Sequence, residues 1–164
     1  MKTLTLLRHA KSSWDERGIP DHDRPLNDRG ERDAPRMAKR LVEAGIRPSL
    51  ILSSTALRAW TTAKIFARQI NYPAEFLQRV SKLYLASRKT LLEVVSRQEN
   101  GFNNIVLVGH NPGLTDFAEY LVPGTTNNIP TCGFLTVSID TDDWNIDNSS
   151  RIDLVAYDYP KNID

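Results

Sequence analysis

Runs of apolar residues alternate with polar segments along the chain, and their lengths predict strands. Residues 3–7, 50–52 and 105–108 form short, nearly continuous apolar runs, and each run ends at a polar residue or a glycine. Such runs are typical of strands that are buried on both faces of a parallel sheet. Residues 134–139 and 152–157 form two further runs around a polar, turn-rich stretch. This second pattern predicts an antiparallel hairpin at an edge of the sheet.

Apolar residues at helical spacing lie between the strand-like runs. They cover residues 34–42, 59–70, 91–95 and 114–121, and so predict four helices. Pro35 lies inside the first pattern, where it marks either the start of the helix or a kink. Strands that alternate with helices predict an α/β fold with a largely parallel sheet that is covered on both faces.

Length and charge exclude several functional classes. We expect the 164 residues to form a single domain over residues 1–164. The 21 basic and 20 acidic residues leave a net charge of +1, so no overall field attracts nucleic acid or an anionic membrane. No apolar run approaches the ~20 residues of a membrane span, and the apolar start before Arg8 is too short for a signal peptide. We therefore expect a cytoplasmic protein in which any anion-binding site is local.

The single cysteine, Cys132, excludes an internal disulfide and a metal site built from several cysteines. Its neighbours are uncharged, and no histidine lies beside it in the sequence to activate a thiolate. We therefore interpret Cys132 as a small residue of the core, and Trp144 as a packing residue.

The residues that directly follow the predicted strands carry the candidate chemistry. In an open α/β sheet, ligands bind beyond the carboxyl ends of the strands. Arg8 and His9 follow the first strand, Arg58 comes shortly after the second, and His110 follows the run 105–108 within Gly-His-Asn-Pro-Gly. Two of the three histidines and two arginines are thus expected at one rim.

Two imidazoles and two guanidiniums in one crevice suit a tetrahedral dianion such as a phosphoryl group. Arginine offers a rigid fork of donors to phosphate oxygens, and histidine can act as a nucleophile or carry a proton. A metal held by the histidines is disfavoured because the arginines would repel the cation and no carboxylate directly follows either histidine. Each residue alone has a simpler explanation: Arg58 could be solvated on its helix, and His110 could cap the next one. The convergence of three distant segments favours phosphoryl transfer.

Other polar residues near these segments are secondary candidates. Lys11 and Ser12 follow His9 closely enough to line the pocket. Arg24 could reach the same rim, or could form a surface ion pair with a neighbouring aspartate. His22 lies in a polar loop, and we interpret it as exposed to solvent.

Several motifs together resemble the histidine phosphatase superfamily, and specifically the SixA-type phosphohistidine phosphatases. They span residues 7–113 in the order found in that family. The matching segments are Leu7-Arg8-His9-Ala10, Arg24-Pro25-Leu26-Asn27-x-x-Gly30, Ser53-Ser54-x-x-x-Arg58-Ala59-x-x-Thr62-Ala63 and Val108-Gly109-His110-Asn111-Pro112-Gly113.

The resemblance implies that His9 attacks phosphorus and carries the phosphoryl group, while Arg8, Arg58 and His110 bind its oxygens. It also implies a three-layer α/β/α fold, no metal and no cofactor. The residues that we expect to contact the substrate are Arg24, Lys11, Ser12 and Asn111.

Two departures from the family pattern bear on the substrate. Ala10 replaces the glycine that usually follows the Arg-His pair, and residues 82–87 lack the glutamate that serves mutases and phosphomonoesterases as general acid. Asp21, Asp23 and Glu93 would be weak substitutes. An alkoxide leaving group needs a proton, and supplying it is commonly worth about 10²–10⁴ in rate, whereas the nitrogen of a phosphoramidate can be protonated beforehand. The sequence therefore favours phosphohistidine in a protein partner, with a small phosphate ester or a non-catalytic phosphoryl-binding role as alternatives.

Overall fold

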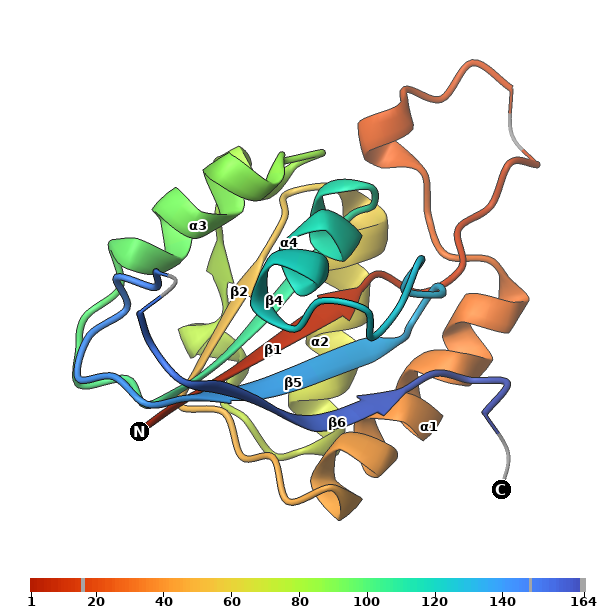
Figure 1. Ribbon diagram of the computed structural model, residues 1–164. Helices are drawn as coiled ribbons and strands as arrows, with labels where there is room; N and C mark the ends of the chain where they lie inside the picture. Colours follow the sequence, from red (N-terminus) through yellow and green to blue (C-terminus); the bar gives the residue numbers. More distant parts are fainter. Residues whose placement is uncertain (16, 148, 163–164) are drawn as a thin grey trace.

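A six-stranded sheet forms the centre of the computed structural model, which describes residues 1–15, 17–147 and 149–162 (Figure 1). The strand order is β3-β2-β4-β1-β5-β6. Neighbours among β1 to β4 pair in parallel, whereas β5 runs antiparallel to both β1 and β6. The sheet is therefore mostly parallel with an antiparallel edge, as predicted. The strands are β1 (Lys2–Arg8), β2 (Leu50–Ser53), β3 (Gln78–Arg79), β4 (Asn104–Gly109), β5 (Phe134–Ile139) and β6 (Ile152–Asp158).

Helices cover both faces of the sheet and complete the predicted three-layer α/β/α architecture. One face packs against α1 and α2, and the other packs against α3 and α4. Short 3₁₀ turns cover residues 21–23, 74–76 and 81–83. The helices are α1 (Asp28–Glu43), α2 (Leu57–Gln69), α3 (Arg88–Ser96) and α4 (Gly113–Leu121).

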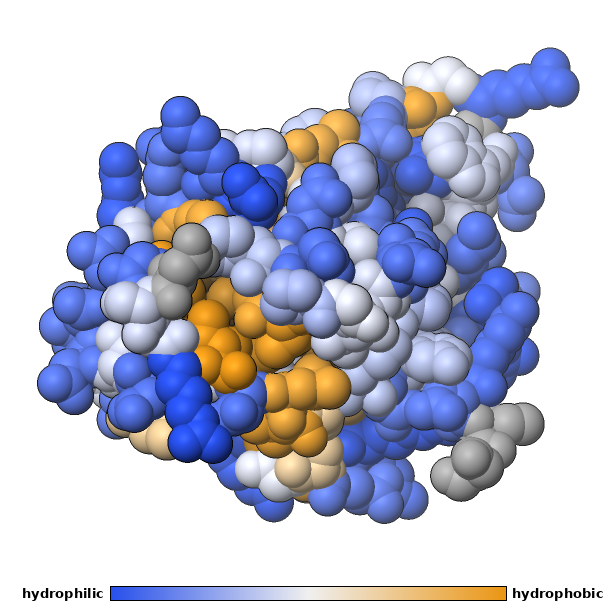
Figure 2. Space-filling view, viewed as in Figure 1, coloured by the Kyte–Doolittle hydropathy of each residue, from blue (hydrophilic) through white to orange (hydrophobic). Residues whose placement is uncertain are grey.

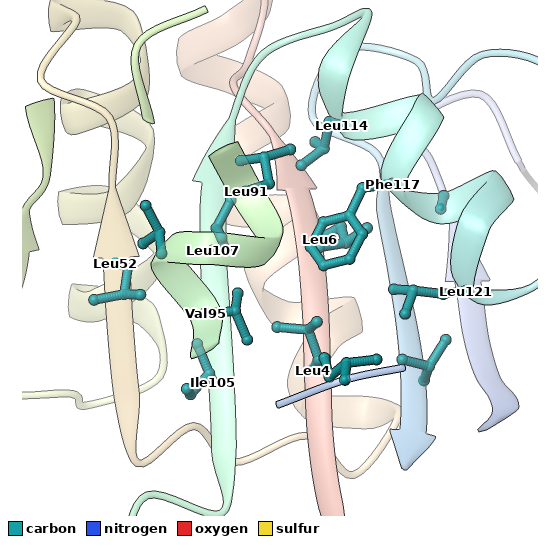
Figure 3. Packing of buried hydrophobic residues seen from close by; sticks show 14 of the residues in the cluster. Leu4, Leu6, Leu52, Leu91, Val95, Ile105, Leu107, Leu114, Phe117 and Leu121 are labelled. Atoms are coloured by element: carbon teal, nitrogen blue, oxygen red, sulfur yellow. The ribbon is translucent and has the colours of Figure 1, made fainter. Parts of the chain in front are cut away.

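The core consists of two apolar layers because successive residues of a strand point to opposite faces. Leu4 and Leu6 of β1 pack toward α3 and α4, while Leu7 packs toward α1 and α2. Figure 3 shows the first layer, in which Leu6 lies near Phe117 of α4. Continuous apolar runs in β1, β2 and β4 are thus explained by burial on both faces.

The structure rules out one of the two interpretations of Pro35, namely that it marks the start of α1. Pro35 lies inside the helix. The helix begins earlier because Asn27 caps it, with its side-chain oxygen accepting a hydrogen bond from Gly30 N at 2.9 Å.

The two central strands send the chain to opposite faces of the sheet. After β1 the chain continues to α1 on one face, and after β4 it continues to α4 on the other. Arg8 is in register with Gly109 at the ends of these strands. Such a divergence opens a crevice at the carboxyl ends of the strands. Figure 1 shows the segment between β1 and α1 standing out from the body at this end.

The antiparallel edge carries the exposed apolar residues of the sheet. Leu154 and Val155 of β6 are about half exposed, and Figure 2 shows apolar surface over this part of the molecule. Trp144 is buried and donates its indole N–H to Phe102 O at 2.8 Å, which confirms its predicted packing role. No helix in the described parts of the chain has the length and apolar character to cross a membrane.

Candidate active site

A cavity of about 220 Å³ lies at the carboxyl ends of β1 and β4, where the chain diverges. All eight residues that the sequence marked as catalytic or substrate-binding line it, and three further residues join them. The lining consists of Arg8, His9, Lys11, Ser12, Trp14, Arg24, Arg58, Leu85, His110, Asn111 and Thr131.

His9 is buried and held in a fixed orientation. Its Nδ1 lies 2.8 Å from the carbonyl oxygen of Ala10, which can only accept a hydrogen bond. A neutral His9 therefore carries its proton on Nδ1 and has a free electron pair on Nε2. The pKa of His9 is lowered to about 4, chiefly by burial and to a smaller extent by the charges of Arg58 and Arg8, while the hydrogen bond to Ala10 opposes the shift. His9 is therefore neutral at pH 7, with burial the larger cause and the arginine charges the smaller one.

His110 faces His9 with a ring-centroid separation of 5.1 Å. Its Nε2 lies 2.8 Å from Ser54 Oγ, and that hydroxyl also accepts a hydrogen bond from Ala56 N at 3.2 Å. When the Ser54 hydroxyl donates to Nε2, a neutral His110 carries its proton on Nδ1. Burial and the neighbouring His9 lower the pKa of His110 to about 3.

The two arginines are anchored by their terminal nitrogens. Arg58 donates to the backbone oxygen of Asp21 at 2.7 Å and to its carboxylate at 3.0 Å, and Arg8 donates to Ile129 O at 2.9 Å. Their Nε atoms are buried and have no hydrogen-bond partner among the described residues, and the same holds for His110 Nδ1. Buried donors without partners are costly to a fold, and the three residues that carry these nitrogens all line one cavity, which favours an anionic ligand there.

The sequence left open whether Arg24 reaches the site or pairs with a neighbouring aspartate, and Arg24 does both. It lines the cavity, where it donates to Ser12 Oγ at 2.9 Å, and its Nε is 3.2 Å from the Asp21 carboxylate. Its guanidinium carbon also lies 3.5 Å from the ring centre of Trp14. The ion pair and the site contact thus belong to the same side chain.

Asp21 and Tyr84 form a hydrogen-bonded pair beside the arginines that the sequence did not reveal. The Tyr84 hydroxyl donates to the Asp21 carboxylate at 2.5 Å, and its ring lies edge-on to His110. Hydrogen bonds from Tyr84 and Arg58 lower the pKa of Asp21 to about 2. His22 is partly exposed, as expected, but its Nε2 contacts Thr55 Oγ1 at 2.8 Å and joins the rim. Nothing in the sequence near Tyr84 marks it, because its contact with Asp21 joins residues that are far apart in the chain.

Thr62 and Gly30, both motif residues, have structural roles beneath the site. Thr62 Oγ1 accepts from Ala10 N at 3.0 Å and donates to Arg58 O at 2.8 Å, so it joins the two segments that carry His9 and Arg58. Gly30 packs against Lys11, whose carbonyl oxygen would lie 2.2 Å from a Cβ at this position. Only glycine permits this close approach.

Asn111 lines the cavity, but its polar atoms are engaged within the protein. Its amide nitrogen donates to Ile129 O at 2.9 Å, and its oxygen accepts from Thr115 N and Oγ1 at the start of α4. Ile129 O is also the acceptor for Arg8. This geometry fits a residue that positions the loop around Arg8 better than one that contacts substrate.

The remaining candidates for chemistry lie outside this arrangement. Cys132 is buried, as expected, and burial raises the pKa of its thiol. Among the described residues, no three His, Cys, Asp or Glu side chains are grouped so that they could hold a metal ion. A larger cavity of about 620 Å³ near Phe76 and Phe102 lies at the amino ends of the strands, away from the histidines.

Comparison with known proteins places this chain in a family. The family model of the histidine phosphatase superfamily (branch 1) matches residues 4–85, half of the chain. An uncharacterized chloroplastic protein of Arabidopsis thaliana is 33% identical over 151 residues, which cover 87% of this chain and 69% of that protein.

Solved structures share the fold over almost the whole chain. A SixA protein from Agrobacterium tumefaciens, assigned as a phosphohistidine phosphatase, is 29% identical with a TM-score of 0.81, covering 97% of this chain and 98% of that one. The protein histidine phosphatase SixA in complex with tungstate is 21% identical with a TM-score of 0.76, covering 92% of this chain and 94% of that one. At 21% identity, this second match shows a shared fold.

Proposed function

The chain belongs to the histidine phosphatase superfamily and is a phosphatase of the SixA type, and on this premise we propose that it hydrolyses phosphohistidine in proteins. His9 is the proposed nucleophile, and Arg8, Arg58 and His110 are the proposed ligands of the phosphoryl group. Arg24, Lys11 and Ser12 are the proposed outer contacts.

One observation carries the proposal. Arg8, Arg58 and His110 come from three separate segments and line one cavity with His9, and each has a buried nitrogen that lacks a hydrogen-bond partner within the described residues. A phosphoryl group has three peripheral oxygens that accept such hydrogen bonds. Two of the donors are cationic, which favours an ionised ligand over a neutral one.

In the first step, the electron pair of His9 Nε2 forms a bond to phosphorus while the bond from phosphorus to the substrate imidazole breaks. The His9 ring becomes cationic as this bond forms. Its Nδ1–H then donates a stronger hydrogen bond to Ala10 O, which lies 2.8 Å away. The charge that develops on the phosphoryl oxygens is stabilised by donors already in place, so little reorganisation is needed.

In the second step, water attacks the phosphoryl group on His9, and the bond from phosphorus to Nε2 breaks. The products are inorganic phosphate and neutral His9. The low pKa of His9, about 4, keeps the free enzyme in the reactive neutral form at pH 7.

The proposed leaving group is supported by the absence of a carboxylic acid among the described residues that line the cavity. Asp21, which bonds Arg58 and Arg24, has a pKa of about 2 and is ionised at neutral pH, so it is a poor general acid. A substrate imidazole that is already protonated needs no such donor, whereas an alkyl phosphate does.

A substrate panel tests the proposal. Purified protein should dephosphorylate a phosphohistidine-bearing phosphocarrier protein at least about a hundredfold faster, by kcat/KM, than a sugar phosphate. Chelator should not change that rate. The His9→Asn variant should lose the activity, and His22→Asn, which alters the histidine outside the cavity, should retain it. Preferred turnover of sugar phosphates would contradict the proposed substrate, and a fully active His9→Asn variant would contradict the proposed nucleophile.

A further inference from the structure

Two large apolar side chains lie at the cavity without any role in the steps above. Trp14 is 72% exposed and Leu85 is 56% exposed, and both line the same cavity as His9 and His110. The other residues that line it are mostly charged or polar. We call Trp14 and Leu85 the collar.

Trp14 is held by the active-site arginine rather than by the core. The guanidinium carbon of Arg24 lies 3.5 Å from the centre of its ring, so the two groups stack. Arg24 in turn is fixed by Ser12 Oγ at 2.9 Å and by the Asp21 carboxylate at 3.2 Å. The exposed indole is therefore positioned by a residue of the phosphoryl pocket.

Leu85 is held in place by an unusual backbone conformation. Its φ of 49° lies in the left-handed region, which is uncommon for a residue with a branched apolar side chain. The next residue, Ala86, packs so tightly on the start of α4 that its carbonyl oxygen would lie 1.8 Å from a Cβ on Gly113. A strained backbone that exposes an apolar side chain beside a candidate site indicates a functional constraint.

We propose that the collar binds the planar ring of the leaving group, and so selects ring-bearing phosphoryl donors. This inference rests on the proposed function and adds the part of the site that recognises the imidazole. An indole and an aliphatic side chain gain free energy by covering a flat ring. They offer no donors or acceptors for the hydroxyl groups of a sugar, which would lose hydrogen bonds to water on entering.

Matched substrates with and without a ring test the collar. Phosphohistidine and phosphoramidate share a bond from phosphorus to nitrogen, but only the first has a ring. 4-Nitrophenyl phosphate and acetyl phosphate form a second pair of activated donors. In Trp14→Ala and in Leu85→Gly, kcat/KM for the ring-bearing member should fall about tenfold, while the ringless member stays within about twofold.

The variants are chosen to preserve the fold. Trp14 is mostly exposed, and glycine adopts the backbone conformation of Leu85 without strain. The inhibition constant for vanadate should stay within about twofold in both variants, which shows that the arginines keep their places, and Trp14→Phe should restore most of the lost activity. Phe76→Ala removes an aromatic side chain of similar exposure from the other end of the sheet. In both substrate pairs it should leave the ratio of kcat/KM between the ring-bearing and the ringless member unchanged.

The outcomes separate the collar from the proposed function. Equal losses for both members of a pair, or no loss in either variant, would overturn the collar. The proposed function is judged separately, by wild-type turnover of a phosphohistidine protein. If the wild type cleaved only bonds from phosphorus to oxygen, the proposed function would fail, and the pair of activated donors would still decide the role of the collar.

Discussion

Asp21 shows how a single exposed residue can organise a buried cluster. Its carboxylate accepts hydrogen bonds from Arg58, Arg24 and Tyr84, and its backbone oxygen accepts another from Arg58. Two of the cavity arginines thus share one anchor. Because the pKa of Asp21 is lowered to about 2, the anchor stays charged over the whole neutral range. We therefore infer that Asp21 positions the arginines and does not donate a proton.

Replacing Asp21 by asparagine tests this positioning role. Asp21→Asn keeps the shape of the side chain but loses its charge, so kcat/KM should fall by about tenfold or more as the arginines lose their orientation. The loss should be equal for phenyl phosphate and 4-nitrophenyl phosphate. A larger loss for phenyl phosphate, the poorer leaving group, would identify Asp21 as a general acid instead. Asp23→Asn is the matched control, because within the described part of the chain the Asp23 carboxylate contacts only the partly exposed His22 side chain.

At the residue scale, the sequence predicted the site residues that directly follow a strand. It did not predict the contacts that depend on segments far away in the chain. His9 and His110 could be placed at one rim because each follows a parallel strand. Tyr84 could not be placed, because its contact with Asp21 joins residues 63 positions apart. The full hydrogen bonding of Asn111 was hidden for the same reason, since it depends on a loop near Ile129.

Close backbone packing between elements determines where the cavity lining lies. The first residue of α4, Gly113, contacts the chain just before α3, at the carbonyl oxygen of Ala86. This contact joins the helix that follows His110 to the segment that carries Tyr84 and Leu85. A side chain at position 113 would separate them.

The Gly113→Ala variant should therefore lose both stability and activity. A Cβ 1.8 Å from a backbone oxygen cannot be accommodated without moving one element, so the free energy of unfolding should fall by at least about 2 kcal/mol. Urea denaturation measures the change. Gly101→Ala is the matched control, because a Cβ there meets no atom within 4 Å, and its stability should match the wild type. Equal stability of the two variants would contradict the role of this contact.

At the element scale, the apolar pattern was sufficient for long, buried elements. The runs that became β1, β2 and β4 were recognisable because both of their faces are buried. β3 was missed, since it has only two residues and both are exposed. The start of α1 was uncertain because Pro35 interrupts the pattern, whereas the Asn27 cap that begins the helix lies in a polar stretch.

For the whole molecule, two buried neutral histidines make stability depend on pH. The pKa values of His9 and His110 fall from 6.5 to about 4 and about 3 on folding. Between about pH 6.5 and 4 the unfolded chain binds more protons than the folded one, so stability is lost as the pH falls through this range. Asp21, with its pKa lowered from 3.8 to about 2, loses its contribution only at lower pH.

Urea denaturation at a series of pH values checks this dependence. The wild-type free energy of unfolding should decrease from pH 7 to pH 4, and the double variant with His9→Asn and His110→Asn should show a smaller decrease over the same range. Parallel curves for the two proteins would contradict the assignment of buried, neutral histidines.

The proposed phosphoryl transfer to His9 is tested most directly by trapping the phosphoenzyme. The protein is mixed with a ³²P-labelled phosphohistidine protein, quenched with alkali within milliseconds, digested and mapped. The label should appear on the peptide that contains His9, should survive alkali and should be lost in acid, as expected for a bond from phosphorus to nitrogen. Label on any other residue, or rapid release of phosphate with no labelled enzyme at any time, would contradict the account.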